Sequence, residues 1–503
     1  MNAHAQHQSR TIHTCTGGEL VPGDVLLAGI GQRLVVMATE PAGEEHIDLS
    51  LRPLDGGPGL RRRMRRFDSV DVLMERVDPA QVGQTAPEPA RPRRRKVVVT
   101  GVGAISPLGG DAASTWEGLL AGVSGARELT GAEFAELPVK VAATAALDPA
   151  DVLPRSQART MNRSTQFAVL TAREAWSDAG LESAAVESER VGVSVGTIIG
   201  GAPVMVDAHR SLTDKGARRV SPHTTPMLVP NASAAHIAIE LGARGEARTV
   251  VAACASGTEA IGLAVDRIRD GHVDVMVAGG TEAVITPEIM AGFANMRALS
   301  PAADGPEGAA RPFDRDRDGF VLGEGAGFLV LEDEEHALAR GARIYCEAAG
   351  WGVSADAHHM TAPEPEGTGI IEAVRKALDS AQAEAADVVH INAHATATPV
   401  GDAAEAAAVR SLFGPDAVPV TAPKGALGHL QGGAGGVEAV ATVLTLHHGL
   451  IPPTAGLTEP EPDLGLDVVT GAPRALESPG VALSNSFGFG GHNAVLAFRS
   501  RAA

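Results

Sequence analysis

The order of the apolar segments restricts the fold of this chain more than any other feature. After KVVVT at Lys96–Thr100, buried-type apolar runs recur as VGVSVG, TVVAAC, VDVMVAG, VVHINAH and VPVTAP, and helical segments separate most of them. Continuous apolar strands connected through helices are typical of mostly parallel sheets that helices cover. The sequence therefore predicts an α/β fold from Lys96 onward. The hydrophobic fraction of 44% is enough for a substantial core.

Residues 1–77 have a different pattern. Short apolar or alternating runs lie at Asp24–Ala28, Arg33–Thr39 and His46–Arg52, and glycine-rich or proline-containing turns separate them. This pattern predicts a small β-rich module of about five strands. Residues 78–95, DPAQVGQTAPEPARPRRR, are rich in proline and charge, so they predict a linker.

Two segments of this module raise the question of binding. RRRMRRF at Arg61–Phe67 is basic, and its simplest interpretation is the solvated face of a strand, with a binding role as the alternative. The Asp68–Ser69 pair in FDSVDV is similar to the phosphopantetheine attachment site of acyl carrier proteins. A carrier domain is helical, whereas the stretch before this pair has a strand pattern. We therefore reject a carrier domain.

The composition excludes several classes of function. The formal charge is -19 and aromatic residues make up 3%, which argues against nucleic acid as a partner. An acidic protein partner would need a local basic patch. No run approaches the roughly 20 apolar residues of a membrane helix, and the polar first residues do not predict a secretory signal. Three cysteines, Cys15, Cys254 and Cys346, make no disulfide framework, so we expect a reduced cytoplasm.

Cys254 lies at a predicted strand-to-helix turn. Thr249–Ala253 is the expected strand, and a helix is expected from Ser256 to about Gly271 because apolar residues recur there at helical spacing. Unpaired N–H groups and the helix dipole at such a turn favour a thiolate, and the same amides could stabilise an oxyanion. Taken alone, a cysteine here is more often a small buried residue that fills a tight turn.

Three later motifs also combine a strand end with polar side chains. INAHATATPVGDAAEA places His394 just after a strand, and a helix is expected to open at Asp402 with Glu405 as its reciprocal capping partner. VTAPKGALGHLQGGAGGVEAV runs from strand to loop to helix, and SNSFGFGGHNAVLAF sets a glycine-rich loop before a closing strand. The further polar and aromatic residues of these motifs are Thr396, Thr398, Lys424, His429, Glu438, Phe487 and Phe489.

Together these motifs carry a resemblance to a family. CASG, AHATAT, KGALGH and SFGFGGHN, with DVMVAGGTEAVITP and RPFDRDRDGFVLGEGAG, make the chain from about Lys96 to Arg501 resemble the type II β-ketoacyl-[acyl carrier protein] synthases. The resemblance covers about four fifths of the chain, and APKGALGH, IPPT and GFGGHN are similar to the actinobacterial branch. It implies a decarboxylative Claisen condensation in which Cys254 accepts the acyl chain and His394 and His429 stabilise the enolate of malonyl carrier protein.

The resemblance also implies roles for other residues. The backbone N–H groups of Cys254 and Phe489 would hold the acyl oxyanion, and the Phe489 ring would be a gate that moves with a loop containing Asp356 and His359. The further implied roles are a buried supporting pair (Lys424 and Glu438), hydrogen bonds to pantetheine (Thr396 and Thr398), and docking of the acidic carrier (Arg155 and Arg159). The two arginines have ordinary solvated side chains as their alternative.

The implied fold is a five-layer αβαβα sandwich of the thiolase-like type. It has two related halves, 96–350 with the nucleophile and 351–503 with the histidines, and forms a homodimer or a heterodimer with a chain-length factor. No metal or other cofactor is expected, since the calcium-like DRDRDG at Asp314–Gly319 has Gly325 where the twelfth-position glutamate belongs. Ala395 and His492 depart from many relatives, which have Gly and Thr there, and could tune the accepted chain length.

Three alternatives remain beside fatty acid elongation. A ketosynthase subunit of a type II polyketide system would use the same residues on a different chain. A non-catalytic chain-length factor is disfavoured because such partners lack the cysteine. A thiolase that cleaves with coenzyme A is disfavoured by the two-histidine pattern.

Overall fold

The computed structural model describes residues 95–501, except 183, 185 and 304, and before them Leu20 and six strands. The chain divides into two compact units, Met1–Arg94 and Arg95–Ala503. Among the described residues, no helix is long and apolar enough to cross a membrane.

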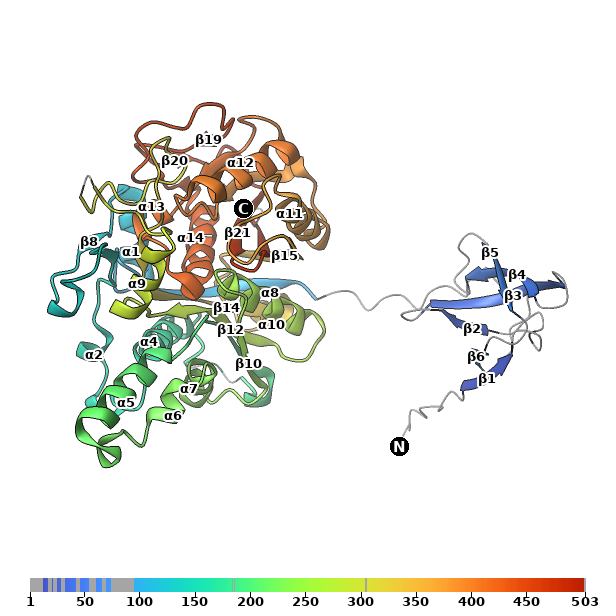
Figure 1. Cartoon of the computed structure of the whole chain (residues 1–503), viewed down its shortest axis with the longest axis horizontal. Helices are drawn as coiled ribbons and strands as arrows, with labels where there is room; N and C mark the ends of the chain where they lie inside the picture. The colour runs from blue at the N-terminus through green and yellow to red at the C-terminus, as the bar shows by residue number, and fades with distance from the viewer. Residues whose placement is uncertain are drawn as a thin grey trace. The chain divides into compact units, whose positions relative to one another are not determined.

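The first unit contains an antiparallel sheet of six strands in the order β1-β6-β2-β3-β4-β5 (Figure 1). The strands are β1 (Ile12–Thr16), β2 (Val25–Ala28), β3 (Gln32–Pro41), β4 (His46–Pro53), β5 (Leu60–Arg65) and β6 (Ser69–Leu73). Three of them lie on the runs that the sequence singled out. Val36, Leu49 and Leu51 are buried. Ser69–Leu73 form a strand, where a carrier domain would have a helix, and Asp68 lies outside the described residues.

The second unit is built on one large sheet that consists of two five-strand groups and a short edge strand. The first group, in spatial order, is β11 (Glu246–Val250), β10 (Val191–Gly196), β12 (Val275–Glu282), β14 (Gly325–Asp333) and β7 (Val97–Ile105). The second group is β15 (Cys346–Ala355), β22 (His492–Arg499), β21 (Val481–Gly488), β16 (Val388–Asn392) and β17 (Pro419–Thr421), with β19 (Asp467–Val468) at the edge. Only two residue pairs, Cys346–Val99 and Glu347–Val98, join the groups.

The two groups have the same topology. When the strands are numbered along the chain within each group and both groups are read from the outside toward their junction, each has the order third, second, fourth, fifth, first. In both, the second strand is parallel to the third and the fourth, and the fifth is antiparallel to the fourth and the first. The fold therefore consists of two related halves, as the resemblance implied.

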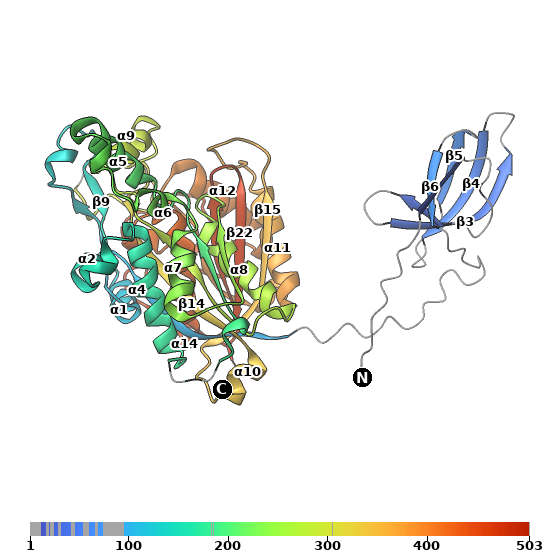
Figure 2. The same ribbon diagram turned by 90° about the horizontal axis from the view of Figure 1, so that it is seen from below.

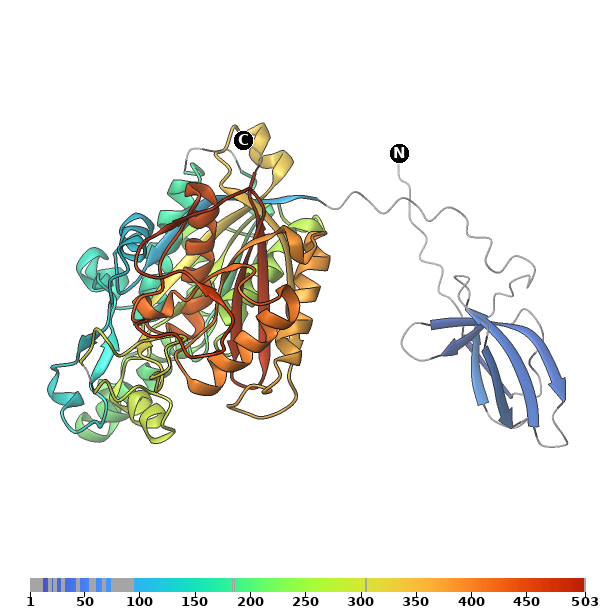
Figure 3. The same ribbon diagram turned by 90° about the horizontal axis from the view of Figure 1, so that it is seen from above.

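Helices cover both groups and fill the space between them (Figures 2 and 3). The outer helices are α4 (Arg163–Asp178) and α7 (Ala232–Leu241) on the first group, and α11 (Thr368–Ala381) and α12 (Pro399–Phe413) on the second half. The inner helices, α8 (Ser256–Arg269) and α14 (Ala434–His448), contact strands of both groups. These two helices approach each other closely at Gly257 and Gly436. A Cβ on Gly257 would lie only 2.8 Å from the Gly436 nitrogen, so a side chain there would clash. This arrangement is the predicted five-layer sandwich.

The remaining elements lie in the connections. The helices are α1 (Ala112–Ala121), α2 (Pro149–Val152), α3 (Arg155–Ala158), α5 (Ala202–Lys215), α6 (Thr224–Leu228), α9 (Pro287–Asn295), α10 (Glu334–Ala339) and α13 (Lys424–Leu427). Short strands are β8 (Arg127–Glu128), β9 (Val141–Ala143), β13 (Leu322–Gly323), β18 (Leu450–Ile451) and β20 (Arg474–Ala475). Three-residue 3₁₀ turns include Gln431–Gly433, which leads into α14.

Candidate active site

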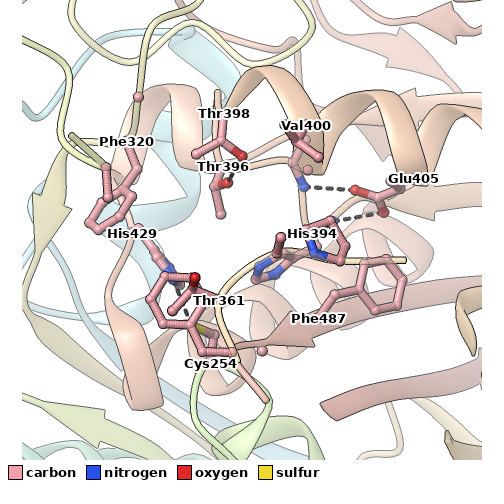
Figure 4. A pocket seen from close by; sticks show the side chains of 18 of the residues that line it. Cys254, Phe320, Thr361, His394, Thr396, Thr398, Val400, Glu405, His429 and Phe487 are labelled. Carbon is pink, nitrogen blue, oxygen red and sulfur yellow. Dashed lines mark hydrogen bonds between the residues drawn. The ribbon is translucent and has the colours of Figure 1, made fainter. Parts of the chain in front are cut away.

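A cavity of about 360 Å³ lies where the two halves meet, and residues of both line its wall (Figure 4). Cys254 comes from the first half, and His394, His429, Thr396 and Thr398 come from the second. The structure thus brings together five residues that the sequence singled out in three separate motifs.

A tight turn between β11 and α8 positions Cys254. The strand ends at Val250, earlier than predicted, and Ala253 takes the left-handed conformation with φ 47°. Ser256 Oγ accepts a hydrogen bond from the Ala252 N–H at 2.9 Å and donates one to the Ala253 carbonyl at 2.6 Å. The turn therefore holds Cys254 beside the first residues of α8, with the residue only 6% exposed.

The protonation state of Cys254 differs from the sequence-based prediction. Burial raises the pKa of the Cys254 thiol to about 11, although the backbone N–H groups of Phe489 and Cys254 and the charge of Lys424 lower it. The predicted preference for a thiolate is therefore wrong for the resting protein, because desolvation outweighs the amides at the turn. Both backbone N–H groups point at the sulfur, and their role as an oxyanion site stays a prediction.

Gly488 allows the second amide to come this close. A Cβ on Gly488 would lie 2.9 Å from the Ala252 carbonyl oxygen and 3.0 Å from the Cys254 nitrogen. Those are backbone atoms that cannot move aside easily. The strand end before Phe489 therefore packs directly against the cysteine turn.

The imidazole rings of His394 and His429 line the cavity together with Cys254. His429 Nε2 lies 3.1 Å from Cys254 Sγ, and the Gln431 Oε1 atom lies 3.9 Å from the same sulfur. The rings of His394 and His429 are 5.5 Å apart between centroids and nearly perpendicular, at 88°. Phe320 packs edge-on against His429 at 5.4 Å. The arrangement places two imidazoles and one thiol around one small volume.

Both imidazoles are neutral. Burial holds the pKa of His394 and of His429 well below 6.5, and the positive charge of Lys424 lowers both further. A neutral imidazole carries one N–H, and neither Nδ1 atom has a hydrogen-bond partner among the described residues. With the hydrogen on Nε2, each ring presents a donor to the cavity.

Glu405 holds the backbone of His394 and Ala395 in place through hydrogen bonds. Its carboxylate accepts hydrogen bonds from the N–H groups of His394 at 2.9 Å and Ala395 at 2.8 Å, and from Asn485 Nδ2 at 3.0 Å. The predicted capping pair of Asp402 and Glu405 is wrong. Helix α12 begins earlier, at Pro399, so both carboxylates lie inside it and bind the backbone of the preceding loop.

Lys424 and Glu438 form the buried ion pair behind the histidines. Lys424 Nζ donates to Glu438 Oε1, and the two side chains are 2% and 1% exposed. Burial raises the pKa of Glu438, and the charge of Lys424 opposes that rise. Lysine and glutamate are rarely this buried unless they are paired, and the supporting role that the resemblance implied for this pair stays a prediction.

Thr396 and Thr398 lie side by side on the cavity wall. Their hydroxyl oxygens are 3.0 Å apart, and Ala397 between them has a positive φ of 66°. Asp402 accepts a hydrogen bond from the Ala397 N–H at 3.1 Å and so supports this unusual conformation. Two hydroxyls in a row suit a ligand with amide groups.

The loop that contains Asp356 meets the loop that contains Phe489. Asp356 Oδ1 accepts from Asn493 Nδ2 at 2.6 Å, and the Asp356 N–H donates to the Gly491 carbonyl at 2.9 Å. Phe489 lines the cavity and is 36% exposed. His359 does not line the cavity; its Nδ1 accepts from the backbone of its own loop, from the Thr361 N–H at 3.1 Å.

Arg155 and Arg159 lie on the surface at α3, and neither lines the cavity. Arg159 Nε donates to the Arg155 carbonyl at 3.2 Å, and both side chains are exposed. Arg297 is the basic residue that does line the cavity. No cluster of histidine, cysteine or acidic residues that could hold a metal occurs among the described residues.

Sequence reasoning missed three contributors to the site. They are Phe320, which packs on His429, Gln431, which reaches the sulfur, and the loop-holding role of Glu405. Gln431 lies two residues after His429 in LGHLQGG, which is a signal that could have been followed. Phe320 comes from a distant segment, and nothing in its local sequence indicates the contact.

Family comparisons agree with this geometry. The model described as "Beta-ketoacyl synthase, N-terminal domain" matches residues 94–337, and "Beta-ketoacyl synthase, C-terminal domain" matches residues 345–458. The chain belongs to the β-ketoacyl synthase family. Among curated relatives, "3-oxoacyl-[acyl-carrier-protein] synthase 2" of Staphylococcus aureus (strain COL) is 44% identical over 410 residues, which is 81% of this chain and 99% of that protein. The protein of the same name from Synechocystis is 44% identical over 81% of this chain and 98% of its own.

Solved structures of related proteins have the same fold. A β-ketoacyl synthase from Burkholderia phymatum is 34% identical with a TM-score of 0.75, over 81% of this chain and 100% of its own. The ishigamide ketosynthase/chain length factor is 36% identical with a TM-score of 0.75, over 81% and 100%. A type II polyketide ketosynthase in complex with its acyl carrier protein is 29% identical with a TM-score of 0.76, over 82% and 100%.

Proposed function

We propose that this β-ketoacyl synthase condenses malonyl-[acyl carrier protein] with an acyl chain held on Cys254, in fatty acid elongation. The observation that carries the proposal is the grouping around one sulfur: His429 Nε2 at 3.1 Å, His394 next to it, and two backbone N–H groups aimed at Sγ. These are the groups that acyl transfer and enolate stabilisation need.

In the first step, the Cys254 sulfur attacks the thioester carbon of the acyl carrier. Cys254 is a thiol at rest; the bond from Sγ to the carbonyl carbon forms first and gives a tetrahedral intermediate. The collapse of this intermediate breaks the bond to the carrier sulfur, and the proton of the Cys254 thiol leaves with the departing pantetheine thiol. The N–H groups of Cys254 and Phe489 would stabilise the negative oxygen of the tetrahedral intermediate.

In the second step, malonyl carrier protein loses carbon dioxide and leaves an enolate. The Nε2–H groups of His394 and His429 would donate to its oxygen, and because both rings are neutral they act as donors rather than acids. The enolate carbon then attacks the acyl carbonyl and expels the Cys254 thiolate. That thiolate takes up one proton and restores the resting thiol.

We further propose roles for the surrounding residues. The paired hydroxyls of Thr396 and Thr398 hold the pantetheine arm, and Phe489 gates the acyl pocket together with the loop of Asp356 and His359. Arg155 and Arg159 dock the acidic carrier, since the chain as a whole carries a charge of -19 and a carrier needs a local basic patch. The enzyme works in the cytoplasm as a homodimer and needs no metal or other cofactor.

A ketosynthase subunit of a type II polyketide system is the second candidate. Two of the similar solved structures favour it. They are the ishigamide ketosynthase/chain length factor and a type II polyketide ketosynthase with its acyl carrier protein. In that case the partner subunit would be a chain-length factor. Weighing the products formed from malonyl carrier and a series of acyl carriers separates the two: single elongation supports the first, and repeated condensation supports the second.

Separate roles for the cysteine and the histidines give the decisive experiment. Cys254→Gln is expected to abolish condensation but to retain or raise carbon dioxide release from malonyl carrier, because its amide imitates the acyl thioester in the oxyanion site. His394→Ala is expected to lose carbon dioxide release about 10²–10³-fold, since one enolate donor is gone. Both are measured without an acyl donor. A folded Cys254→Gln variant as inactive in decarboxylation as His394→Ala would refute this division of labour.

A further inference from the structure

Glu282 is a buried carboxylate at the junction of the two halves to which the mechanism above gives no part. It is the last residue of β12 and is 0% exposed. It forms no salt bridge among the described residues, in contrast to Glu438, which is paired with Lys424. A buried carboxylate without a cation is costly unless several hydrogen bonds satisfy it.

Neutral donors from two loops surround this carboxylate. From the loop after β10, the Ile198 N–H donates to Oε2 at 2.6 Å and Thr197 Oγ1 donates to Oε1 at 3.1 Å. The backbone N–H groups of Ile199 and Gly432 also stabilise the charged form. Gly432 belongs to the second half, so one carboxylate connects a loop of each half.

The contact with Gly432 depends on the absence of a side chain there. A Cβ on Gly432 would lie 2.6 Å from Glu282 Oε2 and 2.9 Å from the Ile198 nitrogen. The turn around Gly432 is the one that carries His429 and Gln431, whose side chains contact the Cys254 sulfur. Gln431 has a positive φ of 53°, so this turn needs support from outside itself.

We propose that Glu282 is a positioning residue, which holds the Gly432 turn against the first half and thereby keeps His429 and Gln431 in place beside Cys254. The inference rests on the proposed function for its catalytic consequence. The effect runs through the backbone, because the groups that shift the pKa of His429 are its own burial and Lys424.

The hydrogen bonds to Glu282 favour its charged form, whereas its burial opposes that form. Burial raises the pKa of Glu282 to about 7, and the four donors of Thr197, Ile198, Ile199 and Gly432 lower it. Only the carboxylate accepts from all of these donors, since a carboxylic acid has an O–H and an amide has an NH2 group in place of one accepting oxygen. Replacing the carboxylate by an amide of the same shape therefore tests the contact with little change in volume.

The test compares Glu282→Gln with the matched control Glu332→Gln in the full chain. Glu332 is also 0% exposed, but it lies opposite Val275 at the other end of β12 and binds Thr100, His336 and Arg340. For Glu282→Gln we expect kcat for carbon dioxide release from malonyl carrier to fall about tenfold or more, with KM within about twofold, because a displaced group costs rate and not carrier binding. For Glu332→Gln we expect a lower Tm but kcat within about twofold per folded molecule.

A second readout needs no substrate. Alkylation of Cys254 by iodoacetamide is expected to accelerate about threefold or more in Glu282→Gln, since the turn that covers the sulfur is released. The control Glu332→Gln should alkylate at the parental rate. A folded Glu282→Gln protein with parental kcat and alkylation, or equal losses in both variants, would overturn the proposal. If the parent itself releases no carbon dioxide, the proposed function fails, and the alkylation rates alone decide about positioning.

Should Glu282→Gln not fold, Thr197→Val provides the milder variant. It removes one donor to Glu282 and preserves the branched shape of the side chain. We expect kcat to fall and alkylation to rise in the same directions by about threefold. Parental values for both quantities in a folded Thr197→Val protein would overturn the proposal.

Discussion

The two halves of the catalytic unit have one topology but hold their reactive groups by different means. In both halves a loop leads from the third strand to a buried helix, β11 to α8 in the first and β17 to α14 in the second. The first loop is short and carries Cys254. The second is longer and carries Lys424 and His429, while His394 follows the second strand of its half, β16.

Backbone geometry holds the cysteine, whereas buried charge holds the histidines. Around Cys254 the supporting features are the positive φ of Ala253, the Ser256 hydroxyl and the close approach of Gly488. Around the histidines they are the Lys424–Glu438 pair and the Glu405 carboxylate. The shared topology thus gives two equivalent loops, of which one carries the nucleophile Cys254 and the other carries His429, whereas His394 comes from a different loop of its half.

The largest effect is expected from removing the charge that supports the second half. Lys424→Met leaves Glu438 buried without its partner, which costs about 3–5 kcal/mol of stability. We expect both the Tm and the rate of carbon dioxide release from malonyl carrier to fall strongly. The control is the double variant Lys424→Met with Glu438→Leu, which should recover much of the Tm without recovering activity. Full activity in that double variant would mean that the pair serves stability alone.

A smaller pair of changes should separate the two halves. Glu405→Gln sets an amide against the His394 and Ala395 N–H groups, and an unsatisfied buried donor costs about 1–3 kcal/mol, so carbon dioxide release should fall about tenfold. Gly488→Ala pushes the Phe489 N–H away from the sulfur, so acyl transfer to Cys254 should fall instead. Each variant is assayed for both steps. Equal losses of both steps in each variant would contradict the division between the halves.

The thiol itself gives a pH test of the first half. Because burial raises the pKa of Cys254 to about 11, the thiolate fraction increases throughout the range below that value. The iodoacetamide rate should therefore rise about tenfold per pH unit from pH 7 to 10. Cys254→Gln, measured in parallel, corrects for the other cysteines. A plateau below pH 8 would show an activated thiolate, as the helix dipole alone had suggested.

The smallest effect is expected from removing the first unit. The family models begin at residue 94, and Arg95 is held to Asp274 at 2.7 Å and Asp333 at 3.0 Å, so a chain that starts at Arg95 retains its first contacts. We predict that such a protein condenses with kcat within about twofold of the parent, and that residues 1–77 serve partner choice or assembly. A soluble, dimeric truncation without activity would contradict this.

Local sequence was sufficient for the elements and for most of the reactive residues. The apolar runs at β10, β12 and β16 and the helix after Ser256 follow from periodicity, and the motifs around Cys254, His394 and His429 are specific enough to indicate a family. The start of α12 was predicted three residues too late, because Asp402 and Glu405 look like a capping pair when only neighbours along the chain are considered.

Tertiary structure alone decided the states and the supports of these groups. Desolvation keeps Cys254 a thiol and both histidines neutral, and desolvation depends on what covers a side chain rather than on its neighbours in sequence. The contacts of Glu282 with Gly432 and of Phe320 with His429 join residues that are more than a hundred positions apart. Residue order determined which groups this chain carries, whereas the packing of its two halves determined their protonation and which of them meet.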